Sequence, residues 1–352
     1  MANQPRVGNI YHMLSYAFRA LREGCFKDVA TEEFATIHEL FAEIISRGVA
    51  AQVRRGLYRE YLQREEVVAG IRGRICITET VSRLTFVNGR LVCAFDEFAA
   101  DTPHNQIIKA VLLLLLRSEA VSIPRKRVLR RLLPYFGEVA DVAPGAIRWG
   151  ALRYDRNSAA YRTLLGICRL VIDGLLLTDE AGAHRLQTWL NDESMAALYE
   201  RFVRSYYQQH HPEFKPRAQY IPWDTEQIDA NSLLPTMKTD VTMQWRSRTL
   251  ILDTKWYSHT MQRHYLSTLQ KYRSDNLYQI YTYVKNRDRG STGNVAGMLL
   301  YAQTDELDTP DQDIVIGGNQ LSLRTLDLTR DWREIVAKLE SLCDWLRGGP
   351  VT

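Results

Sequence analysis

The most informative stretch of this sequence is Thr249-Leu250-Ile251-Leu252-Asp253-Thr254-Lys255, an apolar run that ends in two charged residues separated by a threonine. Its composition favours a buried strand. The run Thr239-Asp240-Val241-Thr242-Met243 precedes it, and the polar residues Arg246-Ser247-Arg248 lie between the two runs. Two β-rich runs joined by a short polar segment predict an antiparallel hairpin.

Two acidic side chains are expected to meet on this hairpin. A turn centred near Arg246 and Ser247 places Asp240 opposite Asp253, where cross-strand Cβ atoms are about 4.5–5.5 Å apart. Asp253 and Lys255 are two residues apart, so both project from the same face of the strand. The turn lacks an Asn-Gly or Asp-Gly pair, the dipeptides that most strongly favour a two-residue hairpin turn, so the turn residues themselves do not fix this register.

A helix is predicted from Ser274 onward. Ser274 suits the N-cap and Asp275 the first turn. Gln279 and Tyr283 are then four residues apart and share one helix face. The apolar residues 295–301 follow as a buried strand. The order strand, strand, helix, strand predicts an α/β core in which the helix crosses the sheet and brings its polar face over the carboxylates.

These side chains match the requirements of phosphodiester hydrolysis. The reaction needs a metal ion, a cation near the developing negative charge and groups that orient phosphate and water. Asp240 and Asp253 suit Mg²⁺, and Lys255 suits the charge or the water. The alternative is an exposed Asp-Lys pair beside a solvated helix face. Asp-x-Lys alone is common, but its combination with Asp240 and the Gln279–Tyr283 helix favours catalysis.

A third acidic residue is available on the helix expected over residues 195–207. Leu198, Phe202 and Tyr206 form its apolar stripe, and Glu200 lies off that stripe. Glu200 therefore has two interpretations: it is a further metal ligand, or it forms a surface ion pair with Arg204.

Composition bounds the class of protein. The 352 residues, 45% hydrophobic and 24% charged, suffice for two domains with separate cores. The net charge of +4 does not by itself argue for nucleic-acid binding. The five cysteines are scattered singly, which argues against structural zinc and against a disulfide framework.

Several functions are excluded by missing patterns. The N-terminus has no signal-like segment, and the longest aliphatic run, Val111–Leu116, is too short to span a bilayer. We therefore expect a cytoplasmic protein without a membrane partner. Neither Gly-x-x-x-x-Gly-Lys-Ser/Thr nor Gly-x-Gly-x-x-Gly occurs, so no nucleotide is expected to bind this chain.

Two domains are predicted, over residues 1–180 and 186–352. The first is helical with a small β-rich subdomain at about 55–98, where glycines punctuate short β-like runs. The polar segment 178–183 marks the boundary, and a last helix is expected over 331–347. The helix at 124–136 carries five cations and no acid, which indicates either a solvated face or a surface for DNA or an acidic partner: Arg125, Lys126, Arg127, Arg130 and Arg131.

The C-terminal motif set resembles the PD-(D/E)XK nuclease superfamily, and Gln279-x-x-x-Tyr283 is similar to the extra motif of its RecB-like branch. The resemblance implies a mixed sheet flanked by helices, in an α/β (α+β overall) chain. It also implies Asp240 and Asp253 as metal ligands and Lys255, Gln279 and Tyr283 as further catalytic residues. One departure is that Pro235 stands five residues before Asp240 instead of beside it.

The N-terminal half contains strings that resemble the McrC family, the nuclease subunits of McrBC 5-methylcytosine restriction systems: Asn9–Ala17, Arg54–Leu57, Gly70–Ile75 and Asp101-Thr102 with Asn105. The resemblance implies that a McrB-like hexameric GTPase binds the GTP and recognises modified cytosine in double-stranded DNA. This chain is then expected to dock through residues 1–180, stimulate GTP hydrolysis and cut the DNA with Mg²⁺. Two alternatives stay open: a non-cleaving activator of the GTPase, and a stand-alone RecB-like repair nuclease.

Overall fold

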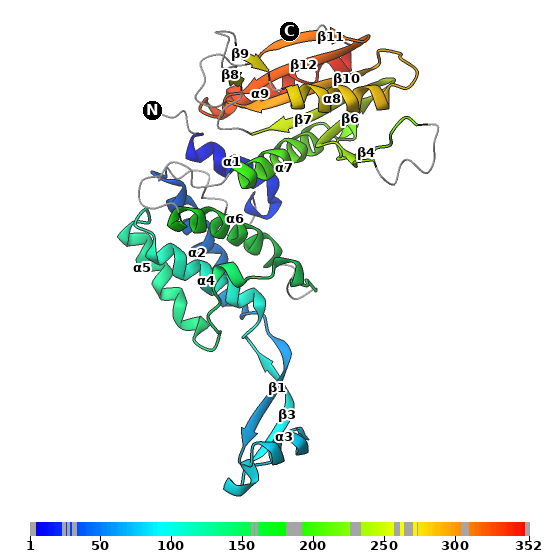
Figure 1. Ribbon diagram of the computed structural model, residues 1–352. Coiled ribbons are helices and arrows are strands. Elements are labelled where there is room, and N and C mark those ends of the chain that lie inside the picture. Colours follow the sequence, from blue (N-terminus) through cyan, green and yellow to red (C-terminus); the bar gives the residue numbers. More distant parts are fainter. Residues whose placement is uncertain are drawn as a thin grey trace. The chain divides into compact units, whose positions relative to one another are not determined.

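The computed structural model describes residues 5–22, 26, 29, 34–155, 158, 161–180, 192–225, 234–256, 261–263, 270–272, 274–303 and 310–348 (Figure 1). The chain forms two compact units. One comprises residues 1–35 together with 181–352, and the other comprises residues 36–180. The predicted boundary segment 178–183 falls at this division, and its residues 181–183 lie outside the described residues.

The first unit is built on a five-stranded mixed sheet with the strand order β11-β12-β10-β7-β6. The central strand β10 (Val295–Ala302) runs parallel to both β7 (Arg248–Lys255) and β12 (Asn319–Leu326). The edge strands β6 (Val241–Trp245) and β11 (Gln312–Ile316) are antiparallel to their neighbours. All eight residues of β10 are buried, as expected for a central strand covered on both faces.

Helices cover this sheet. Helix α8 (Ser274–Arg287) packs on β10 and β7, and α7 (Asp192–His210) packs on β7 and β6. The α8 side of the core contains Ile251, Ile280 and Leu299. The remaining elements of the unit are α1 (Val7–Ala17), η1 (Arg19–Arg22), η7 (Pro212–Phe214), β4 (Tyr220–Ile221), β5 (Met237–Lys238), β8 (Met261–Arg263), β9 (Gln270–Tyr272), α9 (Trp332–Ser341) and α10 (Asp344–Arg347).

The position of α1 differs from the predicted domain of residues 1–180. Helix α1 packs against α7, and the side chain of Asn9, which is 4% exposed, donates to the carbonyls of Leu328 at 2.7 Å and Arg330 at 2.9 Å. The ring of His12 also stacks on Trp332 with 4.3 Å between centroids. The N-terminal segment is therefore part of the unit that contains the mixed sheet.

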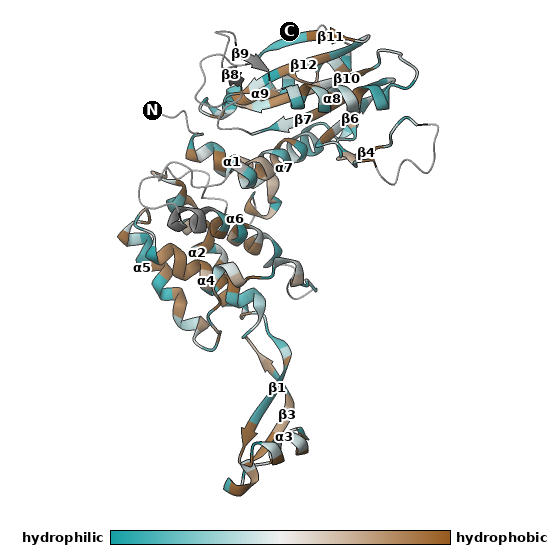
Figure 2. Ribbon diagram, viewed as in Figure 1, coloured by the Kyte–Doolittle hydropathy of each residue, from teal (hydrophilic) through white to brown (hydrophobic). Residues whose placement is uncertain are grey.

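The second unit combines a helical core with a β-hairpin. Helices α2 (Ile37–Arg55), α4 (Pro103–Arg117), α5 (Ile123–Leu132) and α6 (Tyr161–Glu180) pack together, and hydrophobic residues line α2 and α4 (Figure 2). Three further short helices follow α5: η4 (Leu133–Phe136), η5 (Pro144–Ala146) and η6 (Trp149–Ala151).

The predicted β-rich segment is confirmed. Strands β1 (Glu60–Val68) and β3 (Leu91–Ala99) pair along nine residues each, and β2 (Arg74–Ile75) pairs with β3. The segment also contains α3 (Ile77–Ser82) and η3 (Thr85–Asn88), which the sequence pattern did not predict.

The predicted α/β (α+β overall) architecture is confirmed: the described chain combines helices with one mixed sheet and smaller antiparallel sheets. Within the described part of the chain, no helix combines the length and the apolar character needed to cross a membrane.

Candidate active site

The predicted hairpin is confirmed, with the predicted register. Strands β6 and β7 pair antiparallel, with Val241 opposite Leu252 and Trp245 opposite Arg248. Asp240 directly precedes β6, so continuation of this register brings it level with Asp253. The tight turn places Arg246 at a φ of 54°, in the left-handed region. The turn thus forms without the Asn-Gly or Asp-Gly pair that usually supplies this conformation.

Asp240 is held by the residue that separates Asp253 from Lys255. Its Oδ2 atom accepts hydrogen bonds from the backbone amide and from the hydroxyl of Thr254, each at 2.7 Å. Its backbone carbonyl accepts a hydrogen bond from Arg204 on α7 at 3.1 Å. The Asp240 side chain is therefore held against the carboxyl end of β7.

Asp253 and Lys255 form a close ion pair on β7. Asp253 is 2% exposed, and its Oδ2 atom lies 2.5 Å from the Nζ atom of Lys255. This oxygen is buried and accepts no well-aligned hydrogen bond from the described residues. The ammonium of Lys255 also donates to Oε1 of Gln279 at 2.8 Å. Lys255 therefore links the strand carboxylate to helix α8.

A chain of polar contacts continues along α8. Gln279 donates from Nε2 to the Tyr283 hydroxyl at 3.0 Å, and this hydroxyl donates to the carbonyl oxygen of Lys238 on β5 at 3.2 Å. The two residues are four apart on the helix, which is the spacing that lets their side chains meet. Asp253, Lys255, Gln279 and Tyr283 thus form one connected set, anchored at its far end to β5.

Burial and charge repulsion act on both carboxylates. Burial, followed by the charge of Asp253 and that of Glu200, raises the pKa of Asp240 to about 6, against the opposing hydrogen bonds from Thr254. Burial and the Glu200 charge likewise raise the pKa of Asp253, although the Lys255 ammonium opposes them. A positive charge bound between these groups would relieve the repulsion.

Glu200 forms the ion pair with Arg204 that was one of its two interpretations, with 2.6 Å between Oε1 of Glu200 and Nη1 of Arg204. Its charge nevertheless acts on Asp240 and Asp253, so the carboxylate lies within electrostatic range of both. Among the described residues, no group of three or more His, Cys, Asp and Glu side chains is arranged to hold a metal ion. The metal role of Glu200 stays a prediction.

The donor set nevertheless fits Mg²⁺. This ion is usually held by one or two carboxylates, with waters and substrate phosphates completing its octahedron, so a cluster of three protein ligands is not required. Asp240 and Asp253 supply two carboxylates with raised pKa values at the end of one strand, and Asp253 has a buried oxygen without a well-aligned hydrogen bond.

Two contacts at this site were not expected from the sequence. Thr254 was part of the quoted stretch, but strand alternation alone assigns it to the face opposite Asp253. Its role in holding Asp240 depends on the approach of residue 240 to the end of β7. Arg204 was expected only as a partner of Glu200, whereas it also binds the backbone of Asp240. No local signal in the sequence indicates either contact.

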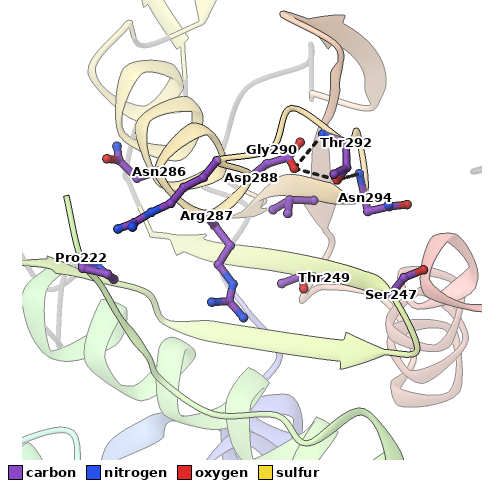
Figure 3. Close-up of a pocket in the computed structure, with 11 residues that line it drawn as sticks. Pro222, Ser247, Thr249, Asn286, Arg287, Asp288, Gly290, Thr292 and Asn294 are labelled. Atoms are coloured by element: carbon purple, nitrogen blue, oxygen red, sulfur yellow. Dashed lines mark hydrogen bonds between the residues drawn. The ribbon is translucent and has the colours of Figure 1, made fainter. Parts of the chain in front are cut away.

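A cavity of about 600 Å³ lies at the other end of the sheet (Figure 3). It is lined by Thr249 and Val295, which pair near the start of β7 and β10, and by residues 286–290, which include the last two residues of α8 and the loop after it. Asp288 lines this cavity and accepts hydrogen bonds from Thr292. The cavity is separate from the Asp240–Asp253 pair, which lies at the carboxyl end of β7.

Comparisons with known proteins find similar proteins over most of the chain. The chain is 26% identical over 341 residues to "Type IV methyl-directed restriction enzyme EcoKMcrBC" of Escherichia coli (strain K12), covering 96% of this chain and 97% of the relative. A solved structure described as a half-complex of Thermococcus gammatolerans McrB AAA+ hexamers with bound McrC matches with a TM-score of 0.51 and 14% identity, covering 96% of this chain and 76% of the other. A cryo-EM structure of the McrBC complex from the same organism matches with a TM-score of 0.42 and 15% identity over 58% of each chain.

The family model described as "McrBC 5-methylcytosine restriction system component" matches residues 7–302. This range includes the N-terminal strings, the hairpin and α8, so it joins both parts of the resemblance seen in the sequence. The chain therefore belongs to the family of McrBC 5-methylcytosine restriction system components.

Proposed function

We propose that this chain is the endonuclease subunit of a GTP-dependent restriction complex, which hydrolyses phosphodiester bonds in double-stranded DNA that contains modified cytosine. The observation that carries the proposal is the connected set at the end of β7, in which Lys255 contacts both the Asp253 carboxylate and Gln279. The mixed sheet with its helix-borne Gln279 and Tyr283 supports a PD-(D/E)XK nuclease of the RecB-like type.

Asp240 and Asp253 would hold Mg²⁺. When bound, this ion supplies a Lewis acid for the phosphate and lowers the pKa of a coordinated water. Thr254 orients the Asp240 carboxylate, and burial keeps Asp253 away from competing solvent. The Lys255 ammonium lies where it can stabilise negative charge on a phosphate. Gln279 holds Lys255 by accepting a hydrogen bond from its ammonium group, and Tyr283 holds Gln279 in turn by accepting one from its Nε2 atom.

A partner is part of the proposal. The T. gammatolerans assembly is described as McrB AAA+ hexamers with bound McrC, and a hexameric McrB-like GTPase is the partner we infer for this chain. The sequence has no phosphate-binding loop of its own, which fits GTP binding by the partner. We propose that residues of the N-terminal half dock on this GTPase and stimulate GTP hydrolysis.

The test is cleavage by the reconstituted complex. The chain is mixed with its McrB-like GTPase, 5-methylcytosine DNA, Mg²⁺ and GTP, and cleavage and GTP hydrolysis are both measured. We expect Asp253→Asn to abolish double-strand cleavage and to leave the stimulated GTP hydrolysis unchanged, because it removes a metal ligand of this chain while the partner binds the GTP. Asp275→Asn is the matched control, since Asp275 is an exposed residue of α8 outside the connected set.

Each alternative has its own result in this assay. Full cleavage by the Asp253→Asn complex would overturn the assignment of the site. Stimulated GTP hydrolysis without metal-dependent cleavage on any DNA would favour an activator that does not cut. Degradation of unmodified DNA by the isolated chain, without GTP, would favour a stand-alone nuclease.

A further inference from the structure

Helix α5 carries five cationic side chains, and one of them has a structural role. Arg125 pairs with Glu39 and Glu43 of α2, with 2.5 Å from its Nε atom to Oε2 of Glu39. All three side chains are largely buried. Leu129 and Leu132 are buried on the same helix. These residues attach α5 to the helical core of its unit.

The other four cations have no such partners. The three arginines are exposed and the lysine is half-buried, and none of the four side chains makes a hydrogen bond or ion pair with the residues that the structure describes: Lys126, Arg127, Arg130 and Arg131. The first turn of α5 contains no acidic residue. We call these four residues the basic face of α5.

Helix stability does not account for the basic face. Lys126 lies four residues before Arg130, and Arg127 four before Arg131, so each pair places like charges side by side, which destabilises a helix. Cations in the first turn also oppose the helix dipole. Arg130 and Arg131, in the last turn, interact favourably with the helix dipole. Lys126 and Arg127, nearer the start of the helix, do not. An anion bound to these residues from outside the unit would attract each cation and offset the repulsion between them.

The dimensions of the basic face suit a nucleic-acid backbone. The basic face spans residues 126–131, which rise about 7.5 Å along the axis of α5. Double-stranded DNA carries one phosphate about every 1.7 Å along its axis when both strands are counted, so about four phosphates fall within this length. Three of the four cations are arginines, whose guanidinium groups match phosphate oxygens in bidentate geometry.

We propose that the basic face of α5 is a contact surface for the phosphodiester backbone of double-stranded DNA. The inference rests on the proposed function, which makes DNA the ligand of this chain. Contacts to phosphates carry no sequence information, so the surface binds modified and unmodified DNA alike. Such a surface, in the unit that lacks the candidate active site, adds a local positive patch to a chain whose net charge is only +4.

The experiment measures the salt dependence of DNA binding by the full chain. Fluorescence anisotropy of a labelled, unmodified duplex is recorded in EDTA over a series of salt concentrations, so that no cleavage occurs. The test variant changes all four residues of the basic face to glutamine, which keeps helix propensity. The matched control changes four exposed arginines elsewhere in the same unit to glutamine: Arg90, Arg117, Arg148 and Arg153.

We expect the slope of log K against log salt to fall by about three to four for the test variant, since each phosphate contact contributes about 0.9. Its affinity at low salt falls about tenfold or more, whereas the control changes much less. The thermal unfolding midpoint of the test variant is expected to equal or exceed that of the wild-type chain, because the changed side chains make no hydrogen bond or ion pair with the described residues and their mutual repulsion is removed.

Three results would overturn the proposal. The first is the absence of salt-dependent binding by the wild-type chain. The second is an equal loss of slope in test and control variants. The third is an unchanged slope together with loss of stimulated GTP hydrolysis in the complex, which assigns the face to an acidic protein surface. Because the binding assay involves no cleavage, Asp253→Asn is expected to keep the wild-type slope, and a failure of the nuclease assignment remains distinct from these results.

Discussion

Thr254 donates two hydrogen bonds to a single oxygen of Asp240, one from its backbone amide and one from its hydroxyl, each at 2.7 Å. The hydrogen bond from the backbone amide is available to any residue except proline at position 254, but the hydrogen bond from the hydroxyl requires threonine or serine. Asp253 and Lys255 project from one face of β7, and the intervening residue holds the second carboxylate. Three consecutive residues of one strand therefore organise the whole candidate site.

Replacement of Thr254 by valine is expected to weaken Mg²⁺ binding. Valine keeps the β-branched shape and the amide but loses the hydroxyl, so Asp240 is less well oriented and its pKa rises further. Residues that orient a metal ligand typically contribute about 10- to 100-fold to metal affinity or activity. Cleavage by the complex, titrated with Mg²⁺, measures the change. Thr254→Ser restores the hydroxyl and should recover most of the activity, whereas equal Mg²⁺ curves for valine and threonine would contradict the orienting role.

Changes along the Lys255–Gln279–Tyr283 contacts are expected to have graded effects. Lys255→Ala removes the ammonium and should lower kcat by about 100-fold or more. Gln279→Ala leaves the ammonium but removes its acceptor, so a smaller loss in kcat is expected. Tyr283→Phe removes hydrogen bonds worth about 1 kcal/mol each and should have the mildest effect.

Single-turnover cleavage by the complex tests this order, with GTP hydrolysis as the control for assembly. Tyr278→Phe is a matched variant, because Tyr278 is an exposed tyrosine of α8 outside these contacts. A loss for Tyr283→Phe as large as that for Lys255→Ala would mean that Tyr283 acts on the substrate directly and does not merely hold Gln279.

Local patterns predicted the parts of the site that depend on short sequence separation. Alternation along β7 placed Asp253 and Lys255 on one face, the short turn set the register with Asp240, and helical spacing brought Gln279 to Tyr283. The roles of these residues are still predictions. The family resemblance, in contrast, is confirmed by the match over residues 7–302.

Local sequence patterns could not predict the contacts between segments that are distant in sequence. The assignment of residues 1–35 to the sheet-containing unit depends on Asn9 binding the carbonyls of Leu328 and Arg330, more than 300 residues away in sequence. The contact of Arg204 with the backbone of Asp240 depended in the same way on where α7 packs, whereas the pair of Glu200 with Arg204 follows from helical spacing. Neither packing arrangement leaves a periodic signal in the chain.

Low pH is expected to destabilise the loop after α8, because the Asp288 carboxylate becomes protonated. Burial by itself raises the pKa of Asp288. Hydrogen bonds from Asn319, Thr292 and Gly293 outweigh burial and lower this pKa to about 2, from an ordinary value of 3.8. A carboxylate whose pKa is lower in the folded state contributes stability that is fully present above its unfolded pKa. That contribution is lost as the pH falls from about 4 through about 2.

Asp288→Asn should therefore cost about 1–3 kcal/mol of unfolding free energy at neutral pH, because buried donors lose their charged acceptor. Denaturant unfolding at a series of pH values measures this cost. The difference between the variant and the wild-type chain should shrink as the pH falls toward 2. A difference that stays constant over this range would show that the Asp288 charge does not contribute to stability.

Gly297 lets α8 approach the sheet closely. The position of α8 also sets the position of Gln279, which belongs to the candidate site. A Cβ atom at residue 297 would lie 2.7 Å from Cγ1 of Ile280, 2.8 Å from Cδ2 of Leu321 and 2.9 Å from Cγ2 of Val284. These distances are too short for carbon atoms, so Gly297→Ala must shift α8 or its side chains. Overpacking of this kind typically costs about 1–3 kcal/mol of unfolding free energy.

Because Ile280 directly follows Gln279, the same shift should move Gln279 away from Lys255 and lower the cleavage rate of the complex. Gly145→Ala is the control, since nothing lies within 4 Å of a Cβ atom there. Unfolding midpoints and single-turnover cleavage rates measure the two effects separately. If Gly297→Ala lowered stability but left the cleavage rate unchanged, the position of α8 would not govern the contact between Gln279 and Lys255.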